Sequence, residues 1–163
     1  MQWFFQGAIV GKMSISIQQE DFDLAAELAA LRADSNHAGA LVSFVGLVRD
    51  LSAGKEIEGI HLDHYPGMCE QVLGNIVAEA TGRWQLLGVR VIHRVGTLLP
   101  DEQIVLVATA AAHRGNAFAG CEFIIDYLKT DAPFWKKEIS TQGEEWLGTR
   151  DEDVKRMEKW RVQ

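Results

Sequence analysis

The sequence predicts an α+β fold with a mixed, mainly antiparallel sheet and packed helices. Segments of strand-like composition alternate with segments whose apolar residues recur at helical spacing, and turns with Pro or Gly separate several of them. The chain has 163 residues, 47% of them hydrophobic, which is enough for one core. No repeat or Pro/Ser-rich linker divides it. We expect one domain over residues 13–163 and an N-terminal extension, residues 1–12, outside the fold.

The first part of the domain carries signals for a helix, a strand and a loop. Leucines recur at helical spacing within residues 21–31, and acids precede them, as a helix N-terminus prefers. Residues 39–49 (GALVSFVGLVR) are rich in β-branched and aromatic residues and predict a buried strand. Residues 50–59 (DLSAGKEIEG) are polar and predict a loop.

The middle of the chain predicts three strands and a helix. Residues 59–65 (GIHLDHY) alternate between apolar and polar and indicate a strand, which a Pro-Gly turn ends. A helix with one apolar face is expected over residues 68–84. Residues 89–96 (VRVIHRVG) alternate again, and residues 103–111 (QIVLVATAA) form the continuous apolar run of a buried strand.

The last third predicts the main packing helix and a small hairpin. Apolar residues recur at helical spacing over residues 116–128, and the chain then reverses at Pro133. Residues 134–139 (FWKKEI) indicate a short strand that turns and returns through residues 145–147. Residues 151–160 (DEDVKRMEKW) predict a final helix, because acids lie at its start and bases near its end.

Charge and composition exclude several classes of protein. The formal net charge is -7 and the isoelectric point is near 5.2, which argues against a general nucleic-acid or membrane-surface binder. The apolar run near the N-terminus is too short to span a membrane and lacks the basic region of a signal peptide. We therefore expect a cytoplasmic protein. Cys69 and Cys121 lie in apolar runs far apart in sequence, which favours buried free thiols over a disulfide.

Common catalytic motifs are missing from the sequence. It contains no G-x-G-x-x-G after a strand, no phosphate-binding P-loop, no H-E-x-x-H and no G-x-S-x-G. His61, His64 and His93 with Asp63 could suggest a metal site. However, His61 and His64 are three residues apart on a predicted strand, which places them on opposite faces. We expect no metal site there.

Cationic side chains form the stronger candidate for a functional site. Arg49 ends a predicted strand, His113 and Arg114 precede the main helix, and Lys129 lies at that helix's far end. A helix N-terminus with an arginine can bind an anion such as a phosphate or carboxylate. Arg114 could equally be a solvated residue of the first turn, and Lys129 an ordinary cation at a helix C-terminus.

The length of the main helix limits which of these cations can meet. At about 1.5 Å per residue it spans roughly 20 Å. His113 and Lys129 of one chain should therefore not touch one small ligand from opposite ends. Either the pocket is built across a dimer interface or the ligand is long.

Several stretches resemble one family. FVGLVRD, LDHYPGM, VIHRVG, AAHR and above all DYLKTDAPFWKKE (126–138) are similar to the large, catalytic subunit of molybdopterin synthase, in the same order over about residues 39–160. The resemblance implies an α/β-hammerhead fold and a homodimer of large subunits. Each large subunit would carry a small ubiquitin-like sulfur-carrier protein with a Gly-Gly tail, giving a heterotetramer.

The resemblance also implies a reaction. Such enzymes convert cyclic pyranopterin monophosphate to molybdopterin by inserting two sulfurs as a dithiolene. The sulfur arrives as a thiocarboxylate on the C-terminal glycine of the small subunit, whose tail enters a pocket of the large subunit. The enzyme would be a sulfurtransferase of molybdenum cofactor biosynthesis, with no permanently bound cofactor. An external sulfur donor agrees with the absence of a relay-like cysteine in this sequence.

Roles for single residues follow from the same resemblance. Lys129 and Lys136 match the catalytic lysines. Arg49, His113 and Arg114 match family residues that contact the substrate anion. Lys137 flanks the pocket. Many members carry a lysine at the position of Leu47, so this chain lacks one potential anion contact. Lysines crowded by other cations and partly desolvated would have lowered pKa values, which would make a neutral amine available.

Aromatic residues near these cations have two interpretations. Phe134, Trp135 and Phe44 could seal the core, or Phe134 and Phe44 could wall the pocket. Strand alternation places Trp135 and Lys136 on opposite faces, so Trp135 is expected to face packing if Lys136 faces the pocket.

A different class of function would give a similar cationic pocket. The chain could be a non-catalytic adaptor that binds a ubiquitin-like tail or a phosphorylated small molecule. A binder would tolerate arginine at positions 129 and 136, whereas acid/base or nucleophilic work needs an amine whose pKa can move.

Overall fold

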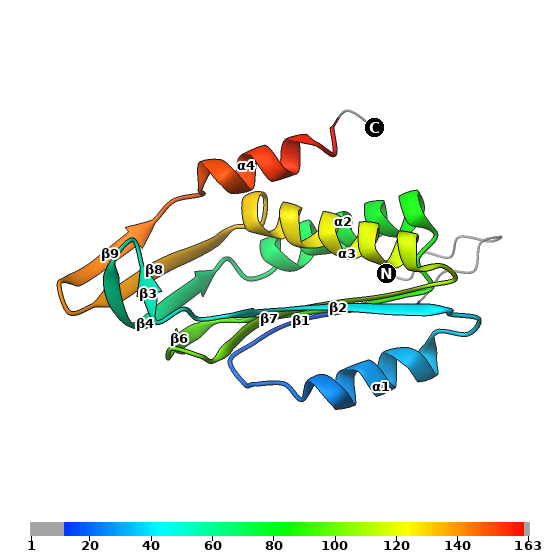
Figure 1. The fold of residues 1–163 in the computed structure, drawn as a ribbon, viewed down its shortest axis with the longest axis horizontal. Helices are drawn as coiled ribbons and strands as arrows, with labels where there is room; N and C mark the ends of the chain where they lie inside the picture. Colours follow the sequence, from blue (N-terminus) through cyan, green and yellow to red (C-terminus); the bar gives the residue numbers. More distant parts are fainter. Residues whose placement is uncertain (1–11, 162–163) are drawn as a thin grey trace.

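A four-stranded sheet forms the centre of the molecule (Figure 1). The structure is a computed structural model and describes residues 12–161. The strand order is β1-β5-β7-β2, with β1 parallel to β5 and the other pairs antiparallel. This confirms the predicted mixed, mainly antiparallel sheet. The bounds are β1 Lys12–Gln18, β5 Gly88–Arg94, β7 Gln103–Ala111 and β2 Ala40–Leu47.

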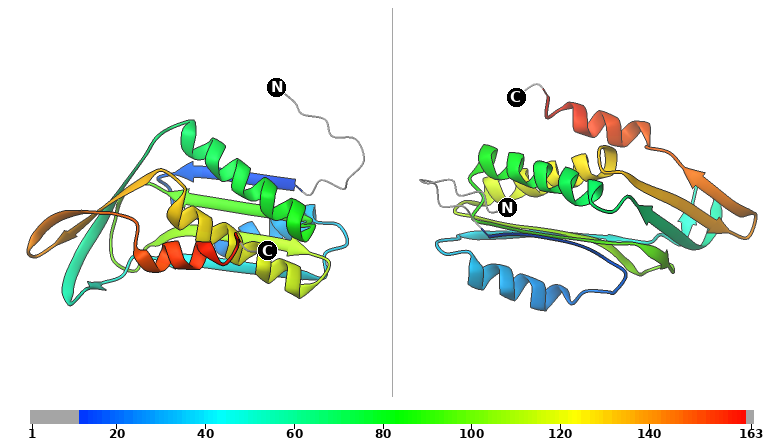
Figure 2. Two further views of the ribbon diagram at one scale, coloured as in Figure 1. Left: turned by 90° about the horizontal axis from the view of Figure 1, so that it is seen from above. Right: turned by 180° about the vertical axis from the view of Figure 1, so that it is seen from behind.

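Helices cover both faces of this sheet. Helices α2 and α3 lie side by side on one face, α1 lies on the other, and α4 runs along α3 (Figures 1 and 2). Helix α2 spans the 68–84 predicted from the sequence, and α3 extends the predicted 116–128 by two residues at each end. The bounds are α1 Leu24–Asp34, α2 Met68–Trp84, α3 Arg114–Thr130 and α4 Asp151–Glu158.

Helix α1 begins later than the sequence predicted. Asp23 is its N-cap, and the Asp23 carboxylate accepts a hydrogen bond from the backbone N–H of Ala26 at 3.0 Å. The acids before Leu24 therefore cap the helix rather than form its first turn.

A second sheet extends from one end of the molecule and carries one side of the candidate site. Its main order is β3-β4-β8-β9, and β6 also pairs with β4. The bounds are β3 Leu51–Ser52, β4 Lys55–His64, β6 Gly96–Leu98, β8 Phe134–Ser140 and β9 Gly143–Leu147. The β8–β9 hairpin has the predicted form.

Two predictions for the first half of the chain are wrong. Residues 50–59, predicted as a loop, contain β3 and the start of β4. The turn between these strands, Ala53-Gly54, has positive φ angles of 50° and 78°, which suit a tight hairpin. Ile57 is buried between two charged neighbours, and one buried apolar side chain in a polar stretch is a weak strand signal.

Strand β2 also differs from its predicted environment. Residues 39–49 were predicted as a buried strand, but β2 is an edge of the sheet, and Leu41, Phe44 and Leu47 are exposed in the single chain. Strand β1, which the sequence analysis missed, has a mostly polar sequence. Lys12, predicted to lie in the extension, is its first residue. Residues 1–11 lie outside the described range.

The main hydrophobic core lies between the central sheet and helices α2 and α3. Phe123 is fully buried there, with Trp84 and Trp160 packed edge-on against its ring at centroid distances of 5.2 and 5.6 Å. Cys69 and Cys121 are buried and free, as predicted. This packing joins α4 to α3, which matters for the site because α4 begins beside it.

Candidate functional site

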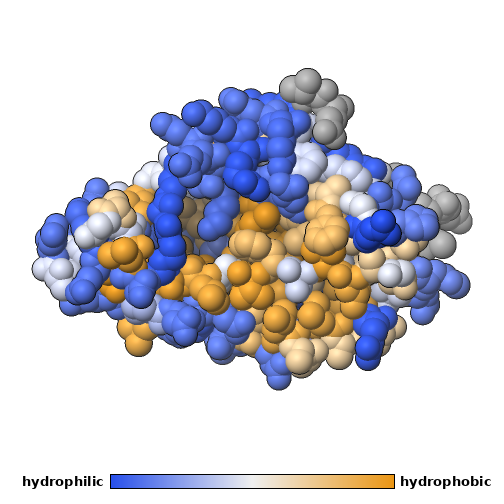
Figure 3. Space-filling model, in the orientation of Figure 1, coloured by the Kyte–Doolittle hydropathy of each residue, from blue (hydrophilic) through white to orange (hydrophobic). Residues whose placement is uncertain are grey.

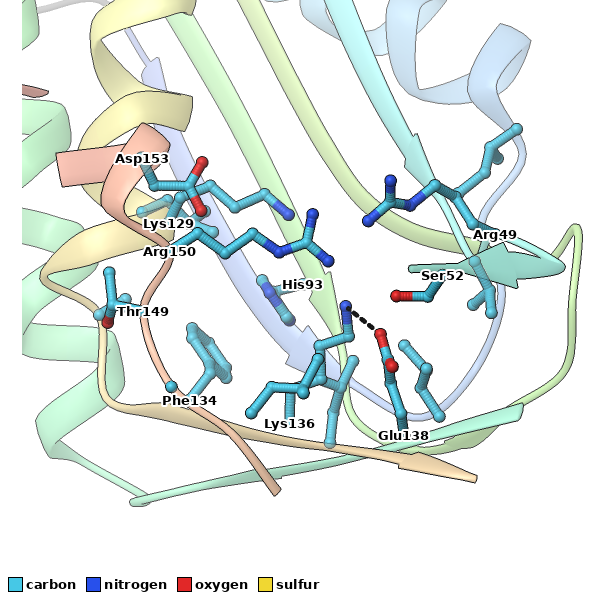
Figure 4. A pocket seen from close by; sticks show the side chains of 18 of the residues that line it. Arg49, Ser52, His93, Lys129, Phe134, Lys136, Glu138, Thr149, Arg150 and Asp153 are labelled. Carbon is cyan, nitrogen blue, oxygen red and sulfur yellow. Dashed lines mark ion pairs between the residues drawn. The ribbon is translucent and has the colours of Figure 1, made fainter. Parts of the chain in front are cut away.

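A cavity of about 360 Å³ opens where the two sheets meet the end of α3 and the start of α4. Figure 4 shows cationic side chains from separate elements pointing into it. Apolar residues from β4, α3 and the loops between elements form part of its wall. The polar residues that line it are Arg49, Ser52, His93, Lys129, Lys136, Glu138, Thr149, Arg150 and Asp153.

Lys129 and Lys136 reach the cavity from neighbouring segments. Lys129 lies in the last turn of α3, and a short link through Pro133 then leads the chain into β8, which carries Lys136. Phe134 and Lys136 both line the cavity, as residues two apart on one strand share a face. The sequence 129–136 thus places two amines on one side of a single cavity.

The surroundings of both amines favour their neutral forms. Desolvation lowers the pKa of Lys129, and Arg150 and Arg49 lower it further, whereas the carboxylate of Asp153 opposes this. Desolvation also lowers the pKa of Lys136, with Lys129 as the next cause, while Glu138 opposes it. Lys129 is nevertheless solvent-exposed in the single chain, so its amine is enclosed by protein but reachable.

Carboxylates keep the cavity from being purely cationic. The Lys136 Nζ lies 3.8 Å from Oε1 of Glu138, whose side chain is only 12% exposed. Asp153, from the first turn of α4, lies in the wall beside Lys129 and Arg150 (Figure 4). The cavity therefore combines cations that can hold an anion with carboxylates that can exchange protons with the lysines.

Arg150, Asp153 and His93 were not predicted as site residues. Arg150 is the N-cap residue of α4 and lies close to Lys129 only because α4 folds back over the end of α3. A basic residue just before an acidic helix start was the only sequence signal for it. His93, which the sequence analysis considered only as a possible metal ligand, is 5% exposed and lines the cavity.

His93 and Phe134 form a stacked pair in the cavity wall. Their ring centroids are 3.8 Å apart and their planes differ by 10°. Desolvation lowers the pKa of His93 to about 4, with the nearby Lys129 and His64 also lowering it. The imidazole is therefore neutral near pH 7. Phe134 both packs on the main core and lines the cavity, so both interpretations of this residue hold.

Four residues predicted to contact or wall the site lie elsewhere in the single chain. His113 and Arg114 are exposed at the opposite end of α3, which has 17 residues and is roughly 25 Å long at about 1.5 Å per residue. Phe44 on β2 does not line the cavity. Lys137 points to the other face of β8, where its Nζ lies 2.7 Å from Glu144.

Trp135 lies on the same face of β8 as Lys137, and its predicted packing is wrong. Trp135 faces away from the cavity, as strand alternation predicted, but it is 51% exposed rather than packed. The Nζ of Lys137 lies 5.5 Å from the ring centroid of Trp146 on the neighbouring strand. Lys137 therefore belongs to a surface group and does not flank the cavity.

The histidines of β4 form no metal-binding group. Nε2 of His61 lies 3.4 Å from Asp63, and His64 faces the opposite side, where its ring is stacked 6.4 Å from Phe134. Across residues 12–161, no three His, Cys, Asp or Glu side chains gather as metal ligands would. No helix in the same range is long and apolar enough to span a membrane.

Comparison with known proteins gives a consistent result. The model of the family described as MoaE protein matches residues 17–131. A molybdopterin synthase catalytic subunit from Ralstonia nicotianae is 53% identical over 149 residues, 91% of this chain and 85% of that protein. One from Vibrio cholerae is 53% identical over 146 residues, which are 90% of this chain and 97% of that one.

A solved structure supports the same assignment. The molybdopterin biosynthesis MoaE protein from Burkholderia ambifaria superposes with a TM-score of 0.80 at 53% identity, covering 93% of this chain and 99% of that one. The hammerhead-like α+β fold expected from the resemblance is thereby confirmed. This chain belongs to the MoaE family, that of the molybdopterin synthase catalytic subunit.

Proposed function

We propose that this protein transfers sulfur from the thiocarboxylated C-terminal glycine of a small ubiquitin-like carrier to cyclic pyranopterin monophosphate, forming the molybdopterin dithiolene. The observation that carries the proposal is the meeting of Lys129 and Lys136, both with lowered pKa values, in one cavity with Arg49 and Arg150. The donor tail and the cyclic phosphate are both anionic, and such a cavity attracts both.

The cysteines support an external sulfur donor. Cys69 and Cys121 are buried, and each thiol lies within hydrogen-bonding distance of a backbone carbonyl. Burial raises the pKa of Cys69, and it raises the pKa of Cys121 to about 12. A protonated, buried thiol is a poor nucleophile. Neither cysteine is therefore suited to relay sulfur. Each of the two transfers would break the C–S bond of one thiocarboxylate as its sulfur passes to the substrate, and water would supply the oxygen of the carboxylate left on the carrier tail.

The two lysines divide the work in this proposal. Lys129 acts as acid/base or nucleophile near the thiocarboxylate carbon, because its amine is reachable and its pKa is lowered. Lys136, paired with Glu138 at 3.8 Å, stabilises the negative charge that develops as sulfur leaves. Arg49 and Arg150 face the cavity from two sides (Figure 4) and would hold the substrate phosphate.

We also propose a homodimer of this chain, with one carrier on each copy. Strand β2 is an unpaired edge, and Figure 3 shows apolar residues gathered over the face on which it lies. The exposed side chains there include Leu41, Phe44 and Leu47. A second copy against this edge would explain how His113 and Arg114, too far from Lys129 in one chain, could reach the site from its partner.

The decisive experiment replaces one lysine at a time. The assay mixes the protein with thiocarboxylated carrier and cyclic pyranopterin monophosphate and measures the dithiolene product. Lys129→Ala should lower turnover by about 10²–10⁴-fold, the usual contribution of an acid/base group, and still bind the carrier. Lys137→Ala is the matched control, because Lys137 lies on the other face of β8, and it should retain activity.

An arginine variant separates an enzyme from an adaptor. Lys129→Arg keeps the positive charge but cannot supply a neutral amine. Binding without turnover in this variant supports catalysis by Lys129. Full turnover in both Lys129→Ala and Lys129→Arg would refute the catalytic role. Carrier binding by the unmodified protein with no dithiolene formed at all would favour the non-catalytic adaptor.

A further inference from the structure

His93 has an unused hydrogen-bonding atom at the candidate site. Its Nδ1 lies 2.8 Å from the carbonyl oxygen of Arg94. A carbonyl only accepts, so Nδ1 carries the proton and Nε2, at the tip of the ring, has a free lone pair. Among residues 12–161, no group donates a hydrogen bond to Nε2. The ring is 5% exposed and lines the cavity.

The stacking of His93 fixes the direction of this lone pair. Phe134 lies flat against one face of the ring at a centroid distance of 3.8 Å, and the Arg94 carbonyl accepts the hydrogen bond at the Nδ1 edge of the imidazole. Turning the ring out of the stack would lose the contact with Phe134, and flipping it within the stack would lose the hydrogen bond at Nδ1. In Figure 4 it lies on the cavity wall between Lys129 and Lys136.

The charges around the ring indicate what it would bind. The charged residues that line the cavity with His93 are the cations Lys129, Lys136, Arg49 and Arg150, and the carboxylates Glu138 and Asp153. The guanidinium groups of Arg49 and Arg150 can bind the anionic groups of a ligand, but they have no acceptor for its N–H groups, and the proposed transfer itself uses the amines of Lys129 and Lys136. A carboxylate would accept such a bond and at the same time repel the ligand's negative charge. A neutral imidazole accepts without repelling.

We propose that Nε2 of His93 accepts a hydrogen bond from an N–H group of the ligand and so orients it between Lys129 and Lys136. The inference rests on the proposed function, which supplies two sources of this chemistry. One is a backbone amide of the carrier's glycine tail, and the other is a ring N–H of the reduced pterin. His93 is then a binding residue of the reaction site in addition to the lysines.

Two variants separate the acceptor from the stacked ring. His93→Phe keeps an aromatic ring against Phe134 and removes Nε2. His93→Gln places a carbonyl oxygen near the Nε2 position and removes the ring. Calorimetry would measure the binding of two probes to the full-length protein: the carrier with an unmodified carboxylate tail, and cyclic pyranopterin monophosphate. Inorganic phosphate is the control probe, because it presents no N–H group.

The expected result is a selective loss of affinity. For at least one probe, His93→Phe should weaken binding by about 5–30-fold, the cost of leaving one donor unpaired, while His93→Gln should stay within about threefold of the unmodified protein. Phosphate binding should not change. The probe that loses affinity identifies the source of the N–H group. Should His93→Phe fail to fold, His93→Asn replaces it, since Asn keeps a donor toward the Arg94 carbonyl and lacks the distal acceptor.

Two results would overturn the inference. One is unchanged affinity of His93→Phe for both probes. The other is an equal loss in His93→Phe and His93→Gln, which would assign the effect to packing rather than to the acceptor. Failure of the unmodified protein to bind either probe would instead refute the proposed function, and this inference with it.

Discussion

Asp126 provides the sharpest test of how the structure holds the site together. Its side chain, on α3, is 5% exposed and anchors the C-terminal helix. Oδ2 accepts a hydrogen bond from Nε1 of Trp160 at 2.8 Å, and Oδ1 accepts one from Nε of Arg156 at 3.1 Å. Nζ of Lys159 lies 3.4 Å from the same carboxylate. Since α4 begins with residues that line the cavity, this anchor should also affect substrate binding.

The effect of Asp126→Asn can be worked out from these contacts. Asparagine keeps one oxygen, so one of the two hydrogen bonds is lost and its donor, buried or half-buried, is left unpaired. This loss lowers the free energy of unfolding by about 1–2 kcal/mol. Arg156 and Lys159 are 57% and 41% exposed, so losing their attraction adds at most about 1 kcal/mol. We expect a loss of about 1–3 kcal/mol in the free energy of unfolding. For this size of domain the melting temperature should fall by about 2–4 °C per kcal/mol.

Urea unfolding measures the stability, and steady-state kinetics measure the functional effect. Asp126→Asn should raise the KM for cyclic pyranopterin monophosphate more than it lowers kcat, because Arg150 is held less firmly while Lys129 stays in place. Trp160→Phe is the matched variant, since it removes the indole donor and leaves the carboxylate. An unchanged urea midpoint in Asp126→Asn would refute the anchor. Lower stability with an unchanged KM would show that Arg150 is positioned without it.

Two further predictions concern the lysine and the packing of the sheet. Asp153→Asn removes a carboxylate that raises the pKa of Lys129, so that pKa should fall further. If Lys129 acts as a neutral amine, the acidic limb of the pH–activity profile should then move to lower pH. A limb that stays or moves to higher pH contradicts this role of Lys129. Gly88→Ala should destabilise the fold by about 1–3 kcal/mol in urea, because the added Cβ would lie 2.2 Å from Oγ of Ser35. Gly74→Ala, a control in α2 with nothing within 4 Å of its Cβ, should stabilise by up to about 1 kcal/mol, and equal effects of the two changes would refute the packing argument.

Much of the fold was predictable because local patterns were strong. Helix α2 has the predicted bounds, and the continuous apolar run of residues 103–111 is β7, one of the two interior strands of the central sheet. Predictions failed where the signal lay outside the segment. Residues 55–59 begin β4, which pairs with the distant strand β8, and β2 is apolar although it is an edge. The apolar side chains of β2 suit contact with a partner chain, and the pattern of a single sequence does not distinguish such a contact from burial in the core.

The site was predictable only in part. Lys129 and Lys136 are seven residues apart in sequence, so a helix end and a turn suffice to bring them together, and a family motif covers both. Arg150 and His93 come from elements far away along the chain. No local period or cap links them to the lysines. Conversely, Lys137 belongs to the same motif, but strand alternation places it on the opposite face.

The sequence by itself determined the helices and most of the strands, the free buried cysteines, the acidic balance and the family, since these depend on local periodicity, composition and motif order. Only the tertiary structure decided that α4 brings Arg150 and Asp153 over the lysines, that His93 stacks on Phe134, and that His113 lies too far away in one chain. The physical reason is that desolvation and Coulomb interactions depend on distances between packed elements, and packing sets those distances.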